Sequence, residues 1–210
     1  MNPIVEFQKK YGLTPDGVVG KNTLLKMMEV FGKTKEEIAY FMGNGKVESG
    51  NFTKMRENMN YSAQRILKIF PYQFKKDFPK AKEYEYNPEK LANYVYDDKN
   101  RSDKGKLGNT IYGQGWKYRG VGGIMTTGHY EMLKLSQYLK NPQIMENPDL
   151  VWQDYYFESM LYFFDRKNIW KHCKLVSDAG IAQVRQRVNG GFIGLKEVTE
   201  ATKEYYQMLK

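Results

Sequence analysis

Residues 34–63, TKEEIAYFMGNGKVESGNFTKMRENMNYSA, contain the features that decide the fold of this chain. Thr34 and Glu37 occupy the N-cap and N3 positions of a capping box, which predicts that a helix begins here. The positions that follow at spacings of three, four and three share one helical face: Ile38, Phe41, Gly45 and Glu48. Because this face should point into the core, we expect Glu48 to lie toward the buried side, where burial disfavours the ionised carboxylate and raises its pKa.

A second glutamate, Glu57, follows nine residues later, in a polar loop that comes after a glycine-containing turn. A core-facing helix and a polar loop are different environments, and such a difference separates a protonated acid from an ionised base. Hydrolysis of a glycosidic bond needs a pair of this kind. The chain has 24 acidic residues, so the spacing alone also fits two surface carboxylates that balance Lys54 and Arg56.

The chain as a whole is predicted to be mainly α-helical. Residues 2–32 indicate two short helices around a turn at 14–17, and a unit of about 30 residues is too small to be stable alone. We divide the chain into this unit, residues 1–32, and a main domain, residues 33–210. The main domain is expected to contain loops at 71–86 and 97–115, a small irregular or β element at 115–128, and helices near 63–70, 88–96, 129–140, 149–166, 177–188 and 195–209.

Composition limits the classes of function. The chain has 210 residues, with 33 lysines and arginines against 24 aspartates and glutamates, which gives a net charge of +9. This charge favours a polyanionic partner and leaves nucleic acid, anionic lipid and bacterial cell wall open. Cys173 is the single cysteine, so an internal disulfide is excluded, and we expect no metal and no cofactor. We see no export signal and no apolar run long enough to cross a bilayer, so we expect synthesis in the cytoplasm without stable membrane insertion.

The motif VESGNF at 47–52 continues into RENMNYSA at 56–63 and IFP at 69–71. This series resembles the catalytic segment of glycoside hydrolase family 19, in particular its phage endolysin branch. Further blocks follow in the order of that family: ANYVY at 92–96, GWKYRGVG at 115–122, Thr127-Gly128 and RVNGG at 187–191. The resemblance covers residues 34–210 and implies a lysozyme/chitinase-like α-helical catalytic domain.

The N-terminal residues carry a second resemblance. FQKKYGL at 7–13, DGVVG at 16–20 and Thr23 resemble half of a peptidoglycan-binding repeat. The two resemblances are independent and point to one partner, bacterial peptidoglycan.

Carried over position by position, the resemblance implies Glu48 as general acid and Glu57 as general base of an inverting mechanism. Thr127 matches a hydroxyl that helps to hold the attacking water, and Asn189 matches a substrate-binding amide. The matching motifs give six more candidate substrate-binding residues: Asn60, Tyr61, Ser62, Trp116, Tyr118 and Arg119. At four positions the chain departs from the residue that is usual in the family. Val47 stands in place of His, Val121 in place of Arg, Met125 in place of Gln and Glu131 in place of Asn.

We therefore expect a monomeric endolysin that hydrolyses β-1,4 bonds of peptidoglycan as a muramidase, for host cell lysis, and reaches the wall through a separate pore-forming protein. Two alternatives stay open: a chitinase, which cuts the same linkage in chitin, and a wall-binding virion protein without activity, which the four departures favour. The lysine- and aromatic-rich stretch 72–86 has the composition of a nucleic-acid track. We interpret it as a rim of the glycan cleft and expect no nucleic-acid partner.

Overall fold

The computed structural model describes residues 2–210 and consists mainly of helices. The chain divides into two compact units, each with its own hydrophobic core. The first unit contains the described residues up to Met55, residues 122–124 and residues 152–210; the second contains residues 56–121 and 125–151. No helix among the described residues combines the length and the apolar composition that crossing a bilayer requires.

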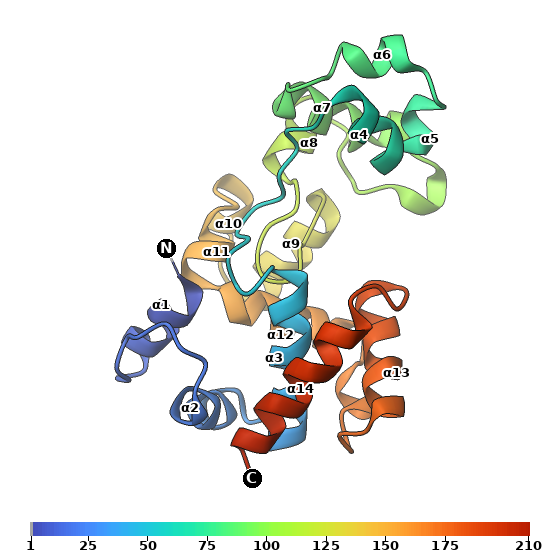
Figure 1. The fold of residues 1–210 in the computed structure, drawn as a ribbon. Helices are drawn as coiled ribbons and strands as arrows, with labels where there is room; N and C mark the ends of the chain where they lie inside the picture. The colour runs from blue at the N-terminus through green and yellow to red at the C-terminus, as the bar shows by residue number, and fades with distance from the viewer. Residues whose placement is uncertain (1) are drawn as a thin grey trace. The chain divides into compact units, whose positions relative to one another are not determined.

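The first unit is built around helix α3 (Lys35–Glu48), which begins at the predicted capping box. Helix α14 (Leu195–Met208) runs alongside α3 (Figure 1). A Cβ at Gly43 would lie 2.2 Å from Oγ1 of Thr202, so only glycine permits this close approach of the two helices. The other elements of the unit are α1 (Pro3–Lys10), α2 (Lys21–Phe31), α12 (Tyr156–Arg166), the short 3₁₀ helix η3 (Trp170–His172) and α13 (Asp178–Asn189).

The two N-terminal helices predicted within residues 2–32 are present as α1 and α2. Their aromatic side chains join the core of the first unit. The ring of Phe7 lies 5.6 Å from that of Phe157, edge to face, and the rings of Phe31 and Phe41 are 6.0 Å apart. Residues 2–32 therefore pack as part of the first unit, and the predicted division after residue 32 lies within one compact unit.

The second unit holds a smaller core, formed around Met59, Ile66, Phe74 and Leu91. Its elements are α4 (Ala63–Ile69), α5 (Pro71–Phe74), α6 (Phe78–Lys82), α7 (Pro88–Val95), η1 (Asp98–Asn100), η2 (Asp103–Gly105), α8 (Gln114–Lys117), α9 (His129–Tyr138) and α10 (Gln143–Glu146). The stretch 71–86, predicted as a loop, contains the short helices α5 and α6, because Pro71 and Pro79 each stand in the first turn of a helix, where the missing N–H costs nothing.

The predicted β element is reduced to isolated antiparallel bridges among the described residues. Val121 pairs with Arg56 and with Thr126, so three chain segments meet at this residue. This local pairing fixes the register of the glycine-rich stretch.

The single helix predicted over 149–166 is wrong, because the chain forms α11 (Leu150–Asp154) and then α12 after a break at Tyr155. At 100° per residue, a continuous helix would place the buried Val151 roughly opposite the buried stripe of Phe157, Met160 and Phe164. The break lets both sets of side chains be buried, Val151 in the second unit and the stripe in the first.

Candidate active site

Glu57 lies in the second unit, half-buried, with its carboxylate held by hydrogen bonds. The hydroxyl of Tyr96 donates to both oxygens, at 2.6 and 2.7 Å, and the N–H of Gly120 donates to Oε2 at 3.2 Å. Tyr96 is 8% exposed, and burial followed by the neighbouring Glu57 charge raises the pKa of its hydroxyl. Tyr96 therefore keeps its proton and acts as a donor to the carboxylate.

The bridges at Val121 place Gly120 directly opposite Glu57. Because Val121 pairs with Arg56 in an antiparallel sense, the residue before Val121 faces the residue after Arg56. The N–H of Glu57 indeed donates to the carbonyl of Gly120 at 2.8 Å. The backbone of Glu57 is thus fixed by the same residue that binds its side chain.

The same register brings Thr127 to the other side of Gly120, because Val121 also pairs with Thr126. The hydroxyl of Thr127 is half-buried and makes one long hydrogen bond, 3.4 Å, to the carbonyl of Met125. A Cβ at Gly120 would stand 3.2 Å from the Cβ atoms of both Glu57 and Met125, so a larger residue here would push against both neighbours. The structure therefore places Glu57 and Thr127 on the two chain segments that flank Gly120, with Met125 close by.

Arg119 is a cation beside this site, and it forms no ion pair with a carboxylate of residues 2–210. Its guanidinium covers the ring of Trp116, 3.4 Å from the ring centroid, and its Nη1 donates to the carbonyl of Trp116 at 2.8 Å. Its Nε is buried and has no hydrogen-bond partner among the described residues. Burial, and secondly the charge of Arg56, lowers the pKa of Arg119 to about 10. Trp116 and Arg119, both predicted from the sequence to bind substrate, therefore form one stacked pair. The buried Nε of Arg119 is the hydrogen-bond donor of this pair that no described residue uses.

Arg56 anchors the chain segment that carries this pair. Its Nε donates to Oδ1 of Asp149 at 2.6 Å, and its Nη1 donates to the carbonyls of Lys117 and Arg119 at 3.2 Å each. Because Arg56 directly precedes Glu57, the position of the carboxylate and that of the 117–119 segment are fixed together.

The remaining candidate substrate-binding residues of the second unit differ in how much of each side chain is exposed and free to contact a ligand. Asn60 is exposed, and Tyr61 is half-buried, with its pKa raised by burial and then by the charge of Glu57. Ser62 caps α4 through its hydroxyl, which accepts from the N–H of Arg65 at 3.4 Å. Tyr118 is 5% exposed and donates its hydroxyl to the carbonyl of Met145 at 3.0 Å, so it supports the fold of this segment.

Glu48 is the last residue of α3 in the first unit, with a quarter of its side chain exposed. Arg185 of α13 donates from Nη1 to Oε1 of Glu48, and its Nε and Nη2 donate to the carbonyl of Ile193 at 2.8 and 2.6 Å. Arg185 itself is only 2% exposed. The environment of Glu48 is therefore an ion pair with a buried arginine, and the apolar environment expected from the sequence is wrong.

Asn189 ends α13 one helical turn after Arg185, and its side chain is exposed. Of the four departures from the family pattern, Val121 is buried and Glu131 forms an ion pair with Lys134 at 3.4 Å. Val47 packs against the core of the first unit.

Two residues of the site were missed in the sequence, Arg185 and Tyr96. Arg185 falls within the buried stripe Ile181, Val184 and Val188 of α13, and a cation at such a position needs a buried partner. Tyr96 continues the buried face of α7, where a tyrosine hydroxyl also needs a partner. Both signals indicate a buried polar contact without identifying the glutamate that makes it.

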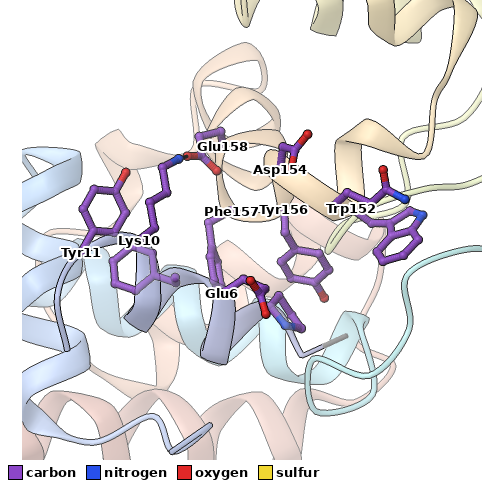
Figure 2. Close-up of a pocket in the computed structure, with 11 residues that line it drawn as sticks. Glu6, Lys10, Tyr11, Trp152, Asp154, Tyr156, Phe157 and Glu158 are labelled. Atoms are coloured by element: carbon purple, nitrogen blue, oxygen red, sulfur yellow. Dashed lines mark hydrogen bonds and ion pairs between the residues drawn. The ribbon is translucent and has the colours of Figure 1, made fainter. Parts of the chain in front are cut away.

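A separate hollow of about 230 Å³ lies in the first unit beside α1 and α12 (Figure 2). Lys10 reaches Glu158 across it, with 3.0 Å between Nζ and Oε1. Its lining combines aromatic rings with carboxylates: Phe7, Tyr11, Trp152, Tyr156 and Phe157, with Glu6, Asp154 and Glu158. No group of three or more His, Cys, Asp or Glu side chains suited to a metal ion occurs in the part of the chain that the structure describes.

Comparison with known proteins connects these features to two families. Residues 2–27 match the family model of a putative peptidoglycan binding domain, which covers α1 and most of α2. A glycosyl hydrolase family 19 domain-containing protein of Haemophilus influenzae is 32% identical over 173 residues, which cover 78% of this chain and 75% of that protein. With its mainly helical fold and its N-terminal peptidoglycan-binding helices, the chain belongs to glycosyl hydrolase family 19.

Proposed function

We propose that this protein hydrolyses β-1,4 glycosidic bonds in the glycan strands of bacterial peptidoglycan, with Glu48 as general acid and Glu57 as general base. The family supports hydrolysis of a glycosidic bond, and the matched N-terminal helices support peptidoglycan as the polymer. The observation that carries the proposal is the set of hydrogen bonds to Glu57.

A general base must hold an ionised carboxylate in one orientation and still accept a proton from water. The two oxygens of a carboxylate offer about four acceptor positions. Tyr96 and Gly120 together make three hydrogen bonds to Glu57, which leaves about one position for the attacking water. Thr127, on the segment that flanks Gly120 on its other side, is a suitable second contact for that water.

Glu48 is suited to the leaving group. Arg185 contacts its Oε1 and fixes its direction, while Oε2 has no hydrogen bond among the described residues. In the proposed mechanism this oxygen takes up a proton from solvent before the reaction and gives it to the glycosidic oxygen as the bond breaks. Inversion requires that the two carboxyl groups lie about 6.5–9.5 Å apart on the bound substrate, with water between one carboxylate and the sugar.

The N-terminal helices are proposed to attach the enzyme to the wall. The hollow beside α1 presents the half-buried rings of Tyr11 and Trp152 with neighbouring carboxylates, a combination that stacks on sugar rings and accepts from their hydroxyls. Action as a phage endolysin that reaches the wall through a pore-forming protein, and a monomeric state, stay predictions from the sequence.

Digestion of purified peptidoglycan tests the proposal. We expect new reducing ends, and mass spectrometry should find N-acetylmuramic acid at those ends, as for a muramidase. New reducing ends of N-acetylglucosamine would show that the enzyme cuts the other β-1,4 bond of the strand. Faster turnover of chitin oligomers than of peptidoglycan would favour a chitinase. Tight binding to walls without release of any soluble fragment would support the alternative of a wall-binding protein.

A further inference from the structure

A hollow of about 320 Å³ in the second unit is lined by four cations and one carboxylate. Its lining residues belong to α5, α6, α7, η1 and the residues beside them, within the lysine- and tyrosine-rich stretch and the segment after α7. The charged groups are Lys75, Lys80, Lys99, Arg101 and Asp77. A concave site with this excess of positive charge concentrates field lines that attract an anion.

None of the four cations is neutralised by an ion pair among the described residues. Lys80 donates to the hydroxyl of Tyr94, a bond that raises the pKa of its ammonium group, and Arg101 donates from Nη1 to the carbonyl of Val95 at 3.1 Å. The ammonium groups of Lys75 and Lys99 are exposed and have no partner in the described part of the chain. Asp77 is the one carboxylate of the lining, and its Oδ1 accepts from the backbone N–H of Lys80 at 3.0 Å. The hollow therefore offers donors and an excess of three positive charges.

The walls of the hollow are held by contacts within the unit. Arg101 is fixed at both ends of its guanidinium, since its Nε also donates to the carbonyl of Gly105 at 2.5 Å. The neighbouring Asn100 donates to the carbonyl of Tyr94 at 2.9 Å. Lys75 adopts a left-handed backbone conformation, with φ of 47°, directly after α5. Arg101 and Lys80, whose side chains are held by hydrogen bonds, lose little freedom when they bind an anionic group.

The sugars of a peptidoglycan strand are N-acetylated and uncharged, and the acidic groups of such a strand lie on the peptides attached to it. Carboxylates are the natural partners of clustered lysine and arginine donors. We infer that this hollow binds a carboxylate of the peptide carried by the peptidoglycan strand. The inference rests on the proposed function for the identity of the polymer.

The position of the hollow relative to Glu57 fits this role. The guanidinium of Arg101 lies 5.8 Å from the ring centroid of Tyr96, and the hydroxyl of the same tyrosine binds Glu57. Arg101 of the hollow and the proposed base Glu57 therefore contact the same tyrosine, and we expect a peptide attached near the scissile bond to extend to the hollow. Such a contact distinguishes peptidoglycan from chitin, which carries no peptide.

The test measures binding of the full chain to insoluble peptidoglycan by co-sedimentation at low salt, before and after a carbodiimide and ammonia have converted the carboxylates of its peptides into amides. The double variant Lys75→Glu/Lys99→Glu is compared with Lys68→Glu/Lys104→Glu, which has the same net charge and changes two exposed lysines of the second unit outside the hollow. We expect the first variant to bind peptide-bearing material about tenfold more weakly than the control, because each exposed ion pair contributes a few-fold. On the amidated material, which stays insoluble but has lost these carboxylates, the two variants should bind equally.

An equal loss on both materials, or no loss at all, would overturn the inference, as would a selective loss of binding to a DNA oligonucleotide. Circular dichroism of both variants checks folding, and Lys99→Gln serves as a milder variant with the same expected selectivity. Co-sedimentation needs no hydrolysis. If no reducing ends appear while binding still follows the peptide, the proposed function fails and the inference about the hollow stands.

Discussion

Replacement of Arg185 by methionine should destabilise the protein by about 3 kcal/mol. The guanidinium makes one hydrogen bond to the carboxylate of Glu48 and two to the carbonyl of Ile193. A hydrogen bond between charged groups contributes about 1.5–3 kcal/mol and one to a neutral group about 1 kcal/mol. Because a quarter of the Glu48 side chain is exposed and water can replace part of the lost contact, we take about 3 kcal/mol rather than the larger cost of a fully buried broken pair.

Urea unfolding followed by circular dichroism measures this loss, and a double-mutant cycle with Glu48→Gln isolates the ion pair. We expect a coupling energy of about 1–2 kcal/mol. In thermal unfolding, 3 kcal/mol corresponds to a decrease in Tm of roughly 6–12 °C for a chain of this size. Arg187→Met is the matched control, because Arg187 lies exposed on the same helix, and it should change stability by less than about 0.5 kcal/mol. A coupling energy within about 0.3 kcal/mol of zero would refute the argument that Arg185 holds Glu48.

Three further predictions follow from the site and the core. Tyr96→Phe keeps the aromatic ring but removes the hydroxyl that donates to Glu57. Hydrolysis should slow at least tenfold, while the free energy of unfolding falls by only about 1 kcal/mol. An unchanged rate would show that this hydroxyl does not position the base. Gly120→Ala should displace Glu57, because the new Cβ would stand 3.2 Å from two neighbouring Cβ atoms. The turnover rate in the same assay should fall roughly tenfold or more. Activity equal to that of the unmodified enzyme would contradict the argument that close packing at Gly120 positions the base. Burial raises the pKa of Tyr40 and of Tyr156 to about 12. Each folded pKa lies above the unfolded value of about 10, so the stabilisation that these two tyrosines provide is complete below pH 10 and is lost as the pH rises through about 12. Urea unfolding at about pH 9 and about pH 11.5 should show a lower free energy of unfolding at the higher pH. An equal free energy of unfolding at the two pH values would contradict this prediction.

The local features of the fold could be predicted from the sequence because neighbouring residues determine them. The capping box of Thr34 and Glu37 is confirmed, and the helices after Ser62 and Ser177 begin where those residues cap them. Gly32, in the left-handed conformation, ends α2 at the C-terminal limit of the predicted helical pair 2–32. Each of these features depends on contacts within one helical turn.

Contacts between distant residues could not be predicted in the same way. Glu48 and Arg185 are 137 positions apart, and no local pattern indicates that they meet. The hydroxyl of Tyr96 and the carboxylate of Glu57 are 39 positions apart, and no local pattern indicates that the end of α7 contacts this glutamate. The motifs identified Glu48 and Glu57 as candidates, whereas the partners that hold them depend on the folded chain.

The most direct test of the account is the release of reducing sugar from purified peptidoglycan by the variants Glu48→Gln and Glu57→Gln. Glutamine keeps the size of each side chain but neither donates the acid's proton nor accepts one from water. We predict that each substitution lowers the rate by at least a hundredfold, while circular dichroism and thermal unfolding show a folded protein. Activity close to that of the unmodified enzyme in both variants would contradict the assignment of these two glutamates as acid and base.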